Sequence, residues 1–335
     1  MEVARLLKNK LLFRRCATYL FILSFTYWIL TSLEILLMIE IIDLHFQNQA
    51  KSIAAFMIET STGPIIIETG PHSTIANIEK ALSAKGYQLK DVQHVFLTHI
   101  HMDHAGAAWV FAEHGATIYV HPFGEKHLID PSKLVSSAKR IYQENMDRLW
   151  GQFKPIPKAQ LKTVVQGEKI TIGGVELIAW NTPGHAVHHI AWQIGKKLIA
   201  GDVAGVKIGA NGMIVPPCPP PDINIEHWMS SIDLLEQLDL DTIYLTHFGK
   251  VTDIPAHFKA LRLILLDWAN WMRPHFDKGS DPKEVTPLFV QYVKNQLIEF
   301  GISKEDIVVY EHANPSWMSV VGLLRYWKKK MEKMG

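Results

Sequence analysis

The sequence has little cysteine: Cys16 and Cys218 are the only two among 335 residues, and no CxxC pair occurs. This excludes a disulfide framework and cysteine-rich zinc or redox motifs, although a single disulfide stays open. The sequence also lacks an excess of one charge, since 34 basic and 33 acidic residues leave a formal net charge of +1. That balance gives no support to a polyanionic partner, so no nucleic acid is expected.

Histidine is plentiful, with seventeen in the chain, and its arrangement indicates a metal site. Four potential ligands, His99, His101, Asp103 and His104, directly follow the apolar run 95–97. An apolar run that ends in polar ligands predicts a buried strand delivering them to the edge of a sheet. Residues two apart in an extended backbone point the same way, so His99 and His101 can bind one ion. The turn that follows would direct Asp103 and His104 towards a second ion.

Three later segments repeat this pattern of an apolar run, small or kinked residues and then one ligand. They end in His185, Asp202 and His247. Each segment is weak evidence alone, but together with the first run they form a strong signal. Imidazole and carboxylate ligands suit Zn²⁺, Fe or Mn²⁺, and no thiolate accompanies them to restrict the choice to zinc.

The hydrophobic pattern predicts alternating strands and helices, followed by a region of helices only. Strands are expected within 39–67, at 95–97, 117–121 and 242–245, and within 163–194, where Gly173-Gly174 indicates a hairpin turn. Helices are expected at 73–85, 105–114, 227–238 and around 134–149. This alternation is typical of an α/β fold. After residue 250, helical spacing recurs at 254–276, 282–300 and 316–334.

Between about residues 39 and 249, these motifs resemble the metallo-β-lactamase superfamily, in its glyoxalase-II-like branch. The resemblance implies an α/β fold of four layers, an αββα sandwich with a helical C-terminal extension. The expected parts are a hydrophobic segment at 1–37, a catalytic domain at 38–250 and the extension at 251–335. The resemblance assigns His99, His101 and His185 to a first metal. It assigns Asp103, His104 and His247 to a second metal, with Asp202 bridging both.

The expected activity is hydrolysis of a small ester, thioester or lactone by a hydroxide that bridges two divalent metal ions. Zn²⁺ is the first choice of metal, with Fe or Mn as alternatives, and Asp103 could also relay a proton. A mononuclear-iron persulfide dioxygenase and a phosphodiesterase of the same fold remain alternatives. Relatives commonly have Asp-Thr-Gly where this chain has Glu68-Thr69-Gly70. The longer Glu68 side chain could shift the geometry of the metal loops without removing a ligand.

Other residues are assigned more weakly. His188 and His189 are expected to be buried and hydrogen-bonded, with contact to the substrate as the alternative. Tyr142, Trp150, Phe248 and the stiff proline loop 216–221 could line a pocket, although aromatic residues at such spacing are more often part of the core. If the C-terminal helices cap the site, an anionic substrate could meet Arg262, Arg273, Tyr292 and Lys294; alternatively, these helices only cover the edge of the sandwich.

The N-terminal stretch 17–38 is almost wholly apolar, with Glu34 as its single charge. It is long enough to cross a bilayer, and basic residues precede it. The expectation is membrane association through an uncleaved anchor if translation begins at Met1. Two alternatives stay open: translation from Met38, which would give a cytoplasmic protein, and a helix packed on the body of the protein.

Overall fold

The computed structural model describes residues 38–334. The chain divides into two units, Met1–Ile39 and Glu40–Gly335, and the fold below is that of the second unit. The segment 1–37, for which a membrane anchor is predicted, lies outside the described residues. Within the described part, no helix is both long and apolar enough to span a bilayer.

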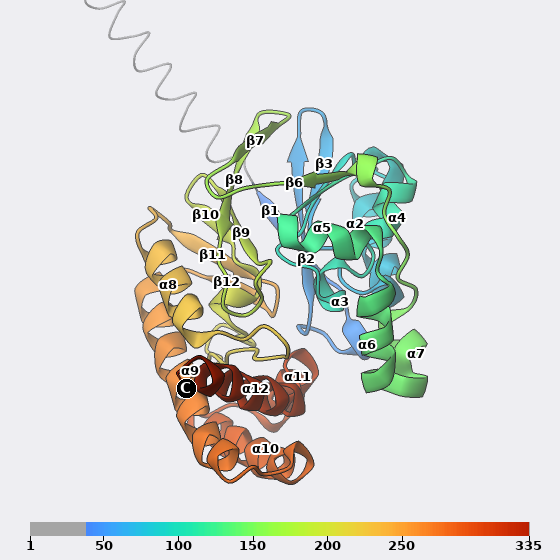
Figure 1. Cartoon of the computed structure of the whole chain (residues 1–335). Coiled ribbons are helices and arrows are strands. Elements are labelled where there is room, and N and C mark those ends of the chain that lie inside the picture. Colours follow the sequence, from blue (N-terminus) through green and yellow to red (C-terminus); the bar gives the residue numbers. More distant parts are fainter. Residues whose placement is uncertain (1–37, 335) are drawn as a thin grey trace, which may run out of the picture. The chain divides into compact units, whose positions relative to one another are not determined.

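Two six-stranded mixed sheets form the centre of this unit (Figure 1). The first has the strand order β1 (Ile39–Asp43), β2 (Ala54–Thr60), β3 (Gly63–Ile67), β4 (His94–Phe96), β5 (Thr117–Val120) and β6 (Leu161–Thr163). The second has the order β12 (Gly249–Val251), β11 (Thr242–Leu245), β10 (Lys197–Ile199), β9 (Ile190–Ile194), β8 (Val175–Asn181) and β7 (Lys169–Ile172). Strands β3 to β6 run parallel, as do β10 and β11, whereas β7 and β8 form the predicted antiparallel hairpin.

The sheets pack face to face through aromatic side chains. Phe96 on β4 meets Trp192 on β9 edge to face, with 5.0 Å between ring centroids. The indole nitrogen of Trp192 also donates a 3.0 Å hydrogen bond to the carbonyl of Leu97. Such pairs contribute beyond simple apolar burial and hold the two inner faces together.

Helices cover the outer faces of both sheets, which confirms the predicted αββα sandwich (Figure 1). Those on the first sheet's side are α2 (Ile75–Ala84), α3 (Met102–Ala105), α4 (Ala108–Glu113), α5 (Pro122–Ile129), α6 (Ser132–Tyr142) and α7 (Met146–Trp150). The second sheet is flanked by α8 (Ile225–Glu236) and α9 (Ile254–Asp277). Short 3₁₀ turns are η1 (Phe46–Asn48), η2 (His72–Thr74), η3 (Leu89–Asp91), η4 (Gln143–Asn145), η5 (Lys158–Gln160) and η6 (Gly201–Ala204).

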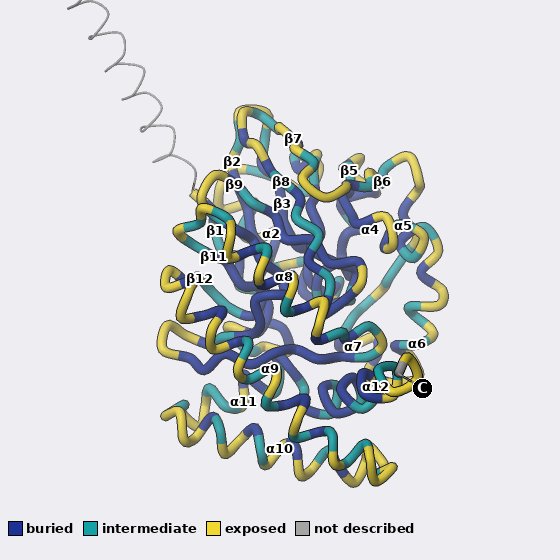
Figure 2. The backbone as a smooth tube through the Cα atoms, turned by 60° about the vertical axis from the view of Figure 1, so that its left-hand side comes forward, coloured by how far each residue is buried: buried dark blue, intermediate teal, exposed yellow. Residues whose placement is uncertain are grey.

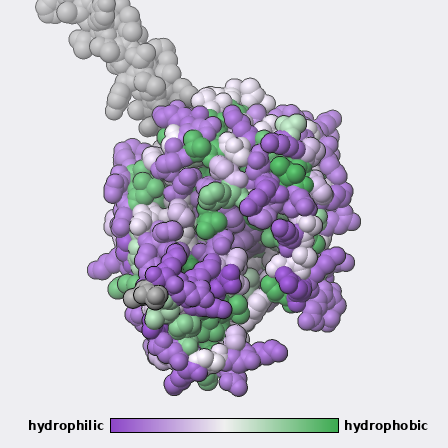
Figure 3. Space-filling model, in the orientation of Figure 1, coloured by the Kyte–Doolittle hydropathy of each residue, from purple (hydrophilic) through white to green (hydrophobic). Residues whose placement is uncertain are grey.

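The C-terminal region is helical as predicted, with α10 (Pro282–Glu299) and α12 (Ser316–Met334) following α9. Helix α11 (Lys304–Ala313) was not expected from the sequence. The central strands lie within the buried part of the tube in Figure 2, whereas α10 lies at the edge with much of its length exposed. Hydrophobic residues gather at the surface over the C-terminal helices (Figure 3), and Leu263 and Leu288 are among those exposed.

Helix α9 joins these helices to the second sheet. Its N-terminus is capped by Asp253, whose carboxylate accepts a hydrogen bond from the backbone of Ala256, and Pro255 fits the first turn. Its buried residues recur every three or four positions, from Phe258 through Leu261 to Met272. One apolar cluster therefore runs from β9–β11 through α8 and α9 into α12.

Candidate metal centre

The predicted ligands meet at one edge of the sandwich. His99 and His101 lie in the turn after β4, and Asp103 and His104 lie in the first turn of α3. Asp202 lies on η6 after β10, and the remaining two ligands follow strands β8 and β11. Parallel strands place their carboxyl ends at the same edge, which is why residues so distant in sequence converge. We call the seven residues the His/Asp cluster: His99, His101, Asp103, His104, His185, Asp202 and His247.

The first trio of the cluster is tightly gathered. His101 Nδ1 lies 2.9 Å from His99 Nε2 and 3.0 Å from His185 Nε2. Three imidazole nitrogens at such separations could hold one metal ion. His101 presents Nδ1 to the centre, whereas the other two histidines present Nε2.

The second trio lies beside the first. Asp103 Oδ2 is 3.5 Å from His247 Nε2 and 3.7 Å from His104 Nε2. These three residues also form a group able to hold a metal ion.

Asp202 lies between the two trios. Its Oδ2 is 3.3 Å from His185 Nε2, whereas its Oδ1 is 3.3 Å from His104 Nε2 and 3.5 Å from His247 Nε2. Each carboxylate oxygen therefore faces a different set of imidazoles. This is the arrangement that a bridging ligand requires.

Buried atoms without a hydrogen bond support a cation in this place. Within the described residues, His104 Nε2 and Asp202 Oδ1 are buried and make no hydrogen bond, although they lie 3.3 Å apart as an ion pair. A buried carboxylate oxygen that lacks a hydrogen bond recovers only part of its lost hydration from such a contact. Divalent cations would satisfy these atoms, so the donor set fits the metal ions that the sequence predicts.

Backbone carbonyls orient several of the imidazoles from behind. His185 Nδ1 donates to the carbonyl of Pro217 at 2.8 Å, and His247 Nδ1 donates to that of Ser52 at 2.6 Å. In the neutral imidazole, donation from Nδ1 leaves Nε2 unprotonated and directed towards the cluster. The stiff proline loop thus supports a ligand by its backbone, a role that its sequence does not indicate.

The cluster holds most of its side chains in the protonation state that metals need. Burial lowers the pKa of His99 well below its usual value and that of His101 to about 3, and neighbouring histidines add to the effect. Burial alone would raise the pKa of Asp202, but His104, His185 and His247 outweigh it and hold the pKa well below its usual range. Neutral imidazole and ionised carboxylate are the ligand forms.

His104 and His247 differ from the other histidines. Burial acts to lower their pKa values, but the carboxylates of Asp202 and Asp103 raise both above the usual value, with Glu68 adding to the effect at His104. A metal ion would replace protons at this trio.

The two neighbouring histidines, His188 and His189, are both buried. His189 is hydrogen-bonded as expected: its ring contacts Thr182 Oγ1 at 2.7 Å and accepts from the backbone nitrogen of Asp202 at 3.1 Å. It therefore holds the backbone of the central carboxylate. The expectation of hydrogen bonding is wrong for Nδ1 of His188, which has no partner among the described residues.

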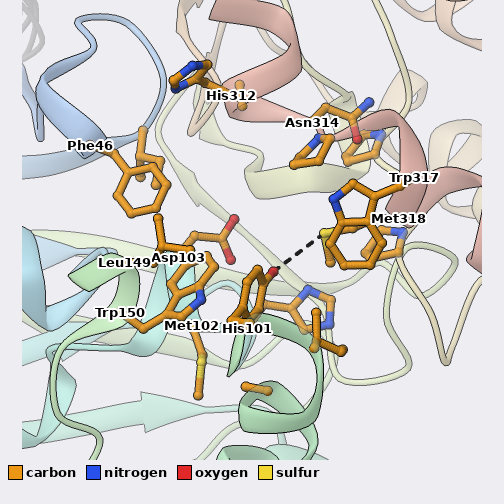
Figure 4. A pocket seen from close by; sticks show the side chains of 18 of the residues that line it. Phe46, His101, Met102, Asp103, Leu149, Trp150, His312, Asn314, Trp317 and Met318 are labelled. Carbon is orange, nitrogen blue, oxygen red and sulfur yellow. Dashed lines mark hydrogen bonds between the residues drawn. The ribbon is translucent and has the colours of Figure 1, made fainter. Parts of the chain in front are cut away.

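A cavity of about 520 Å³ opens onto the cluster. Five cluster residues line it, together with Tyr142, Trp150 and much of the proline loop, so for these two aromatic residues the less favoured of the two interpretations is correct. Phe248 is not among its lining residues and packs on the second sheet's apolar cluster, as the core interpretation expects. Figure 4 shows Asp103 and His101 between Phe46 and Trp150 on one side and Trp317 and Met318 on the other.

The four residues considered for an anionic substrate, Arg262, Arg273, Tyr292 and Lys294, do not line this cavity. Arg262 pairs with Asp233 and Glu236, and Arg273 pairs with Asp277. Tyr292 donates to Asp267, and Lys294 lines a separate apolar pocket. Sequence reasoning missed Phe46, Trp317 and Met318, because isolated apolar residues carry no local signal that distinguishes a cavity wall from a core.

Comparisons with known proteins identify the family of this chain. The model of the metallo-beta-lactamase superfamily matches residues 50–247, which include the whole His/Asp cluster. The metallo-beta-lactamase fold-containing protein ST1585 of Sulfurisphaera tokodaii is 26% identical over 192 residues, covering 56% of this chain and 69% of its own. The probable metallo-hydrolase YqjP of Bacillus subtilis is 26% identical over 213 residues, covering 57% of this chain and 66% of its own.

A solved structure shows the same fold. The metallo-beta-lactamase family protein TTHA1429 of Thermus thermophilus superimposes with a TM-score of 0.61 and 19% identity, covering 88% of this chain and 94% of that one. At that identity the likeness concerns the fold alone, and it confirms the expected αββα sandwich. Because the family model covers more than half of the chain, this protein belongs to the metallo-beta-lactamase superfamily.

Proposed function

We propose that this protein is a hydrolase with two divalent metal ions that cleaves an ester, thioester or lactone. The observation that carries the proposal is the position of Asp202, whose two carboxylate oxygens face two different sets of imidazoles at 3.3–3.5 Å. Because this carboxylate lies between two groups of three potential ligands, the arrangement supports the binding of two metal ions and not of a single one. It also supports the glyoxalase-II-like branch that the sequence resembles.

The ligands of the His/Asp cluster would form two metal sites. His99, His101 and His185 would hold one ion, and Asp103, His104 and His247 the other. Bound there, two ions would lower the pKa of a shared water towards neutrality and polarise the carbonyl of the substrate. Zn²⁺ suits this mixture of imidazole and carboxylate, and Fe or Mn would also be accepted.

The remaining chemistry belongs to the protein. The oxygen of water bonds to the carbonyl carbon, the bond from that carbon to the leaving oxygen or sulfur breaks, and a proton of water passes to the leaving atom. Asp103 is suited to carry that proton because its side chain is 24% exposed, lines the cavity and lies against His247. The products are a carboxylic acid and an alcohol or thiol.

Metal content and substrate panels test this proposal. We expect two ions per chain and metal-dependent hydrolysis of carboxylic esters, thioesters or lactones. Asp202→Ala and His104→Ala should each lower kcat/KM by at least about a thousandfold, since either change disrupts the paired site. His114→Ala serves as the matched control, because this histidine is exposed, lies outside the His/Asp cluster and bonds through its ring to the carbonyl of Val110 on the preceding helical turn.

Two results would replace the proposal. One iron per chain together with oxygen consumption would favour the persulfide dioxygenase, which needs fewer ligands. Cleavage restricted to phosphodiesters would favour a phosphodiesterase of the same fold. Full activity in both Asp202→Ala and His104→Ala would exclude a mechanism based on paired metals.

A further inference from the structure

The walls of the cavity above the His/Asp cluster are mainly apolar. On one side they comprise Phe46, Ile53 and residues of the α6–α7 segment, including Leu149 and Trp150. The opposite side comprises prolines of the loop 217–221 and the first turn of α12, with Trp317 and Met318. The volume of about 520 Å³ lies within the range of roughly 300–1,000 Å³ typical of small-molecule sites. It is far larger than an acetyl group requires.

Aromatic contacts connect these walls. Trp150 stacks on Phe46 with 5.4 Å between centroids and meets Tyr142 edge to face at 5.1 Å. Tyr142 in turn meets Trp317 at 6.3 Å. Its hydroxyl donates to the sulfur of Met318 at 3.7 Å, the contact drawn as a dashed line in Figure 4. A thioether is a weak hydrogen-bond acceptor, so the surroundings of the Tyr142 hydroxyl are also largely apolar.

The cavity has little positive charge with which to bind an anionic substrate. Apart from histidines, Arg148 is the only basic residue among those described that line it. Its guanidinium is exposed and is already engaged by Asn145 Oδ1 at 3.1 Å and Gln47 Oε1 at 3.3 Å. At the walls away from the His/Asp cluster, a phosphate or carboxylate of the substrate would lose hydration without gaining a matching cation.

We propose that the substrate is an uncharged ester, thioester or lactone with an extended apolar group, which binds along the aromatic walls while its carbonyl meets the cluster. This inference rests on the proposed hydrolase function and adds the substrate class to it. The driving force for binding is apolar burial, so affinity should rise with the length of the apolar group.

Three esters with the same leaving group test this proposal: p-nitrophenyl acetate, p-nitrophenyl octanoate and the mono-p-nitrophenyl ester of suberic acid. The octanoate should exceed the acetate in kcat/KM by at least about tenfold, because each buried methylene favours binding. The suberate matches the octanoate in length but ends in a carboxylate. It should fall at least about tenfold below the octanoate, because that charge must be buried without a partner.

Two variants on α6 form a matched pair. Ser137 lines the cavity, whereas the adjacent Ser136 does not and is exposed, with its hydroxyl bonded to the carbonyl of Lys133. Ser137→Phe should fill the cavity and lower the ratio of octanoate to acetate activity by about tenfold. Ser136→Phe should leave that ratio unchanged. Equal ratios in the two variants would overturn the assignment of the cavity.

Binding without turnover separates this inference from the proposed function. The uncharged ketone 2-decanone and the keto acid 9-oxodecanoic acid can be compared by tryptophan fluorescence, since Trp150 and Trp317 line the cavity. Tighter binding of the ketone, weakened in Ser137→Phe, would support the apolar substrate class even if no ester were hydrolysed. Tighter binding of the keto acid, or metal-dependent hydrolysis without preference for the octanoate, would overturn it and leave the hydrolase proposal standing.

Discussion

Glu68 lies behind His104, at the position for which the sequence resemblance implies Asp-Thr-Gly in place of Glu68-Thr69-Gly70. Its buried Oε1 is 3.4 Å from His104 Nδ1 and accepts a 3.3 Å hydrogen bond from the backbone of Thr98. The backbone φ of Glu68 is +66°, a conformation that non-glycine residues rarely adopt. The longer side chain therefore reaches both a cluster histidine and the turn that carries His99.

Removing the Glu68 carboxylate should weaken metal binding. Glu68→Ala is expected to lower metal affinity by roughly 10–100-fold, because an orienting partner of His104 is lost. Competition with a chromogenic chelator measures the affinity. Glu68→Gln, which keeps an acceptor for Thr98, should retain more affinity than Glu68→Ala. Unchanged binding in Glu68→Ala would mean that His104 needs no such partner.

His257 gives the fold a pH dependence independent of metal. Its Nε2 donates to the carbonyl of Ala204 at 2.7 Å, and burial lowers its pKa from 6.5 to about 4. As the pH falls below 6.5, the unfolded chain binds a proton that the folded protein accepts only near pH 4. The free energy of unfolding should therefore fall over that interval, by about 3 kcal/mol at its acid end.

Denaturant unfolding of the metal-free protein at pH 7.5 and pH 5 tests this effect. His257→Gln, which does not titrate, should lose less stability between the two pH values than the unaltered protein. The same loss in both proteins would assign the effect to other histidines, such as His99.

At the scale of elements, the packing of α12 against the proline loop connects the C-terminal helices to the metal centre. A Cβ on Gly322 would overlap the backbone carbonyl of Cys218, so only glycine permits this approach. The backbone nitrogen of Cys218 also donates to Ser319 Oγ at 3.4 Å. Pro217, the preceding residue of the loop, accepts the hydrogen bond of His185.

The Gly322→Ala substitution therefore has two opposing effects on stability: alanine favours the helical backbone, but its Cβ would overlap the carbonyl of Cys218. In an exposed helix this change would stabilise by about 1 kcal/mol. Here we expect a loss of roughly 1–3 kcal/mol, because the loop must move, together with weaker metal binding through His185. Thermal unfolding and metal titration measure the two effects. A gain in stability would show that the proline loop can move away from the new methyl group at little energetic cost.

At the scale of the whole molecule, the C-terminal helices share one apolar cluster with the second sheet. Leu198 on β10 and Phe258 on α9 belong to it, as do Trp268 and Trp327. A chain ending at residue 250 should expose this surface and fail to unfold cooperatively, as judged by near-ultraviolet circular dichroism and calorimetry. A soluble fragment 38–250 with a sharp transition would instead support the predicted separate domain.

Metal removal should destabilise the whole molecule, because the cluster joins loops from both sheets. With free Zn²⁺ at about a hundred times its dissociation constant, one site contributes about 2.7 kcal/mol to the free energy of unfolding. Chelation should remove this increment, and Asp202→Ala should reduce it. A chelator without effect on the midpoint of unfolding would contradict a metal in this site.

The sequence by itself determined the superfamily, the alternation of strands and helices up to residue 250 with helices only after it, and the seven clustered residues. These follow from local patterns: apolar periodicity sets the elements, and ligands directly after buried strands must reach a sheet edge. Tertiary structure alone decided what surrounds the cluster. The Ser52 and Pro217 carbonyls behind the imidazoles, and Trp317 and Met318 above them, come from distant segments whose residues look ordinary in sequence. Only folding shows that their surfaces form one apolar cavity.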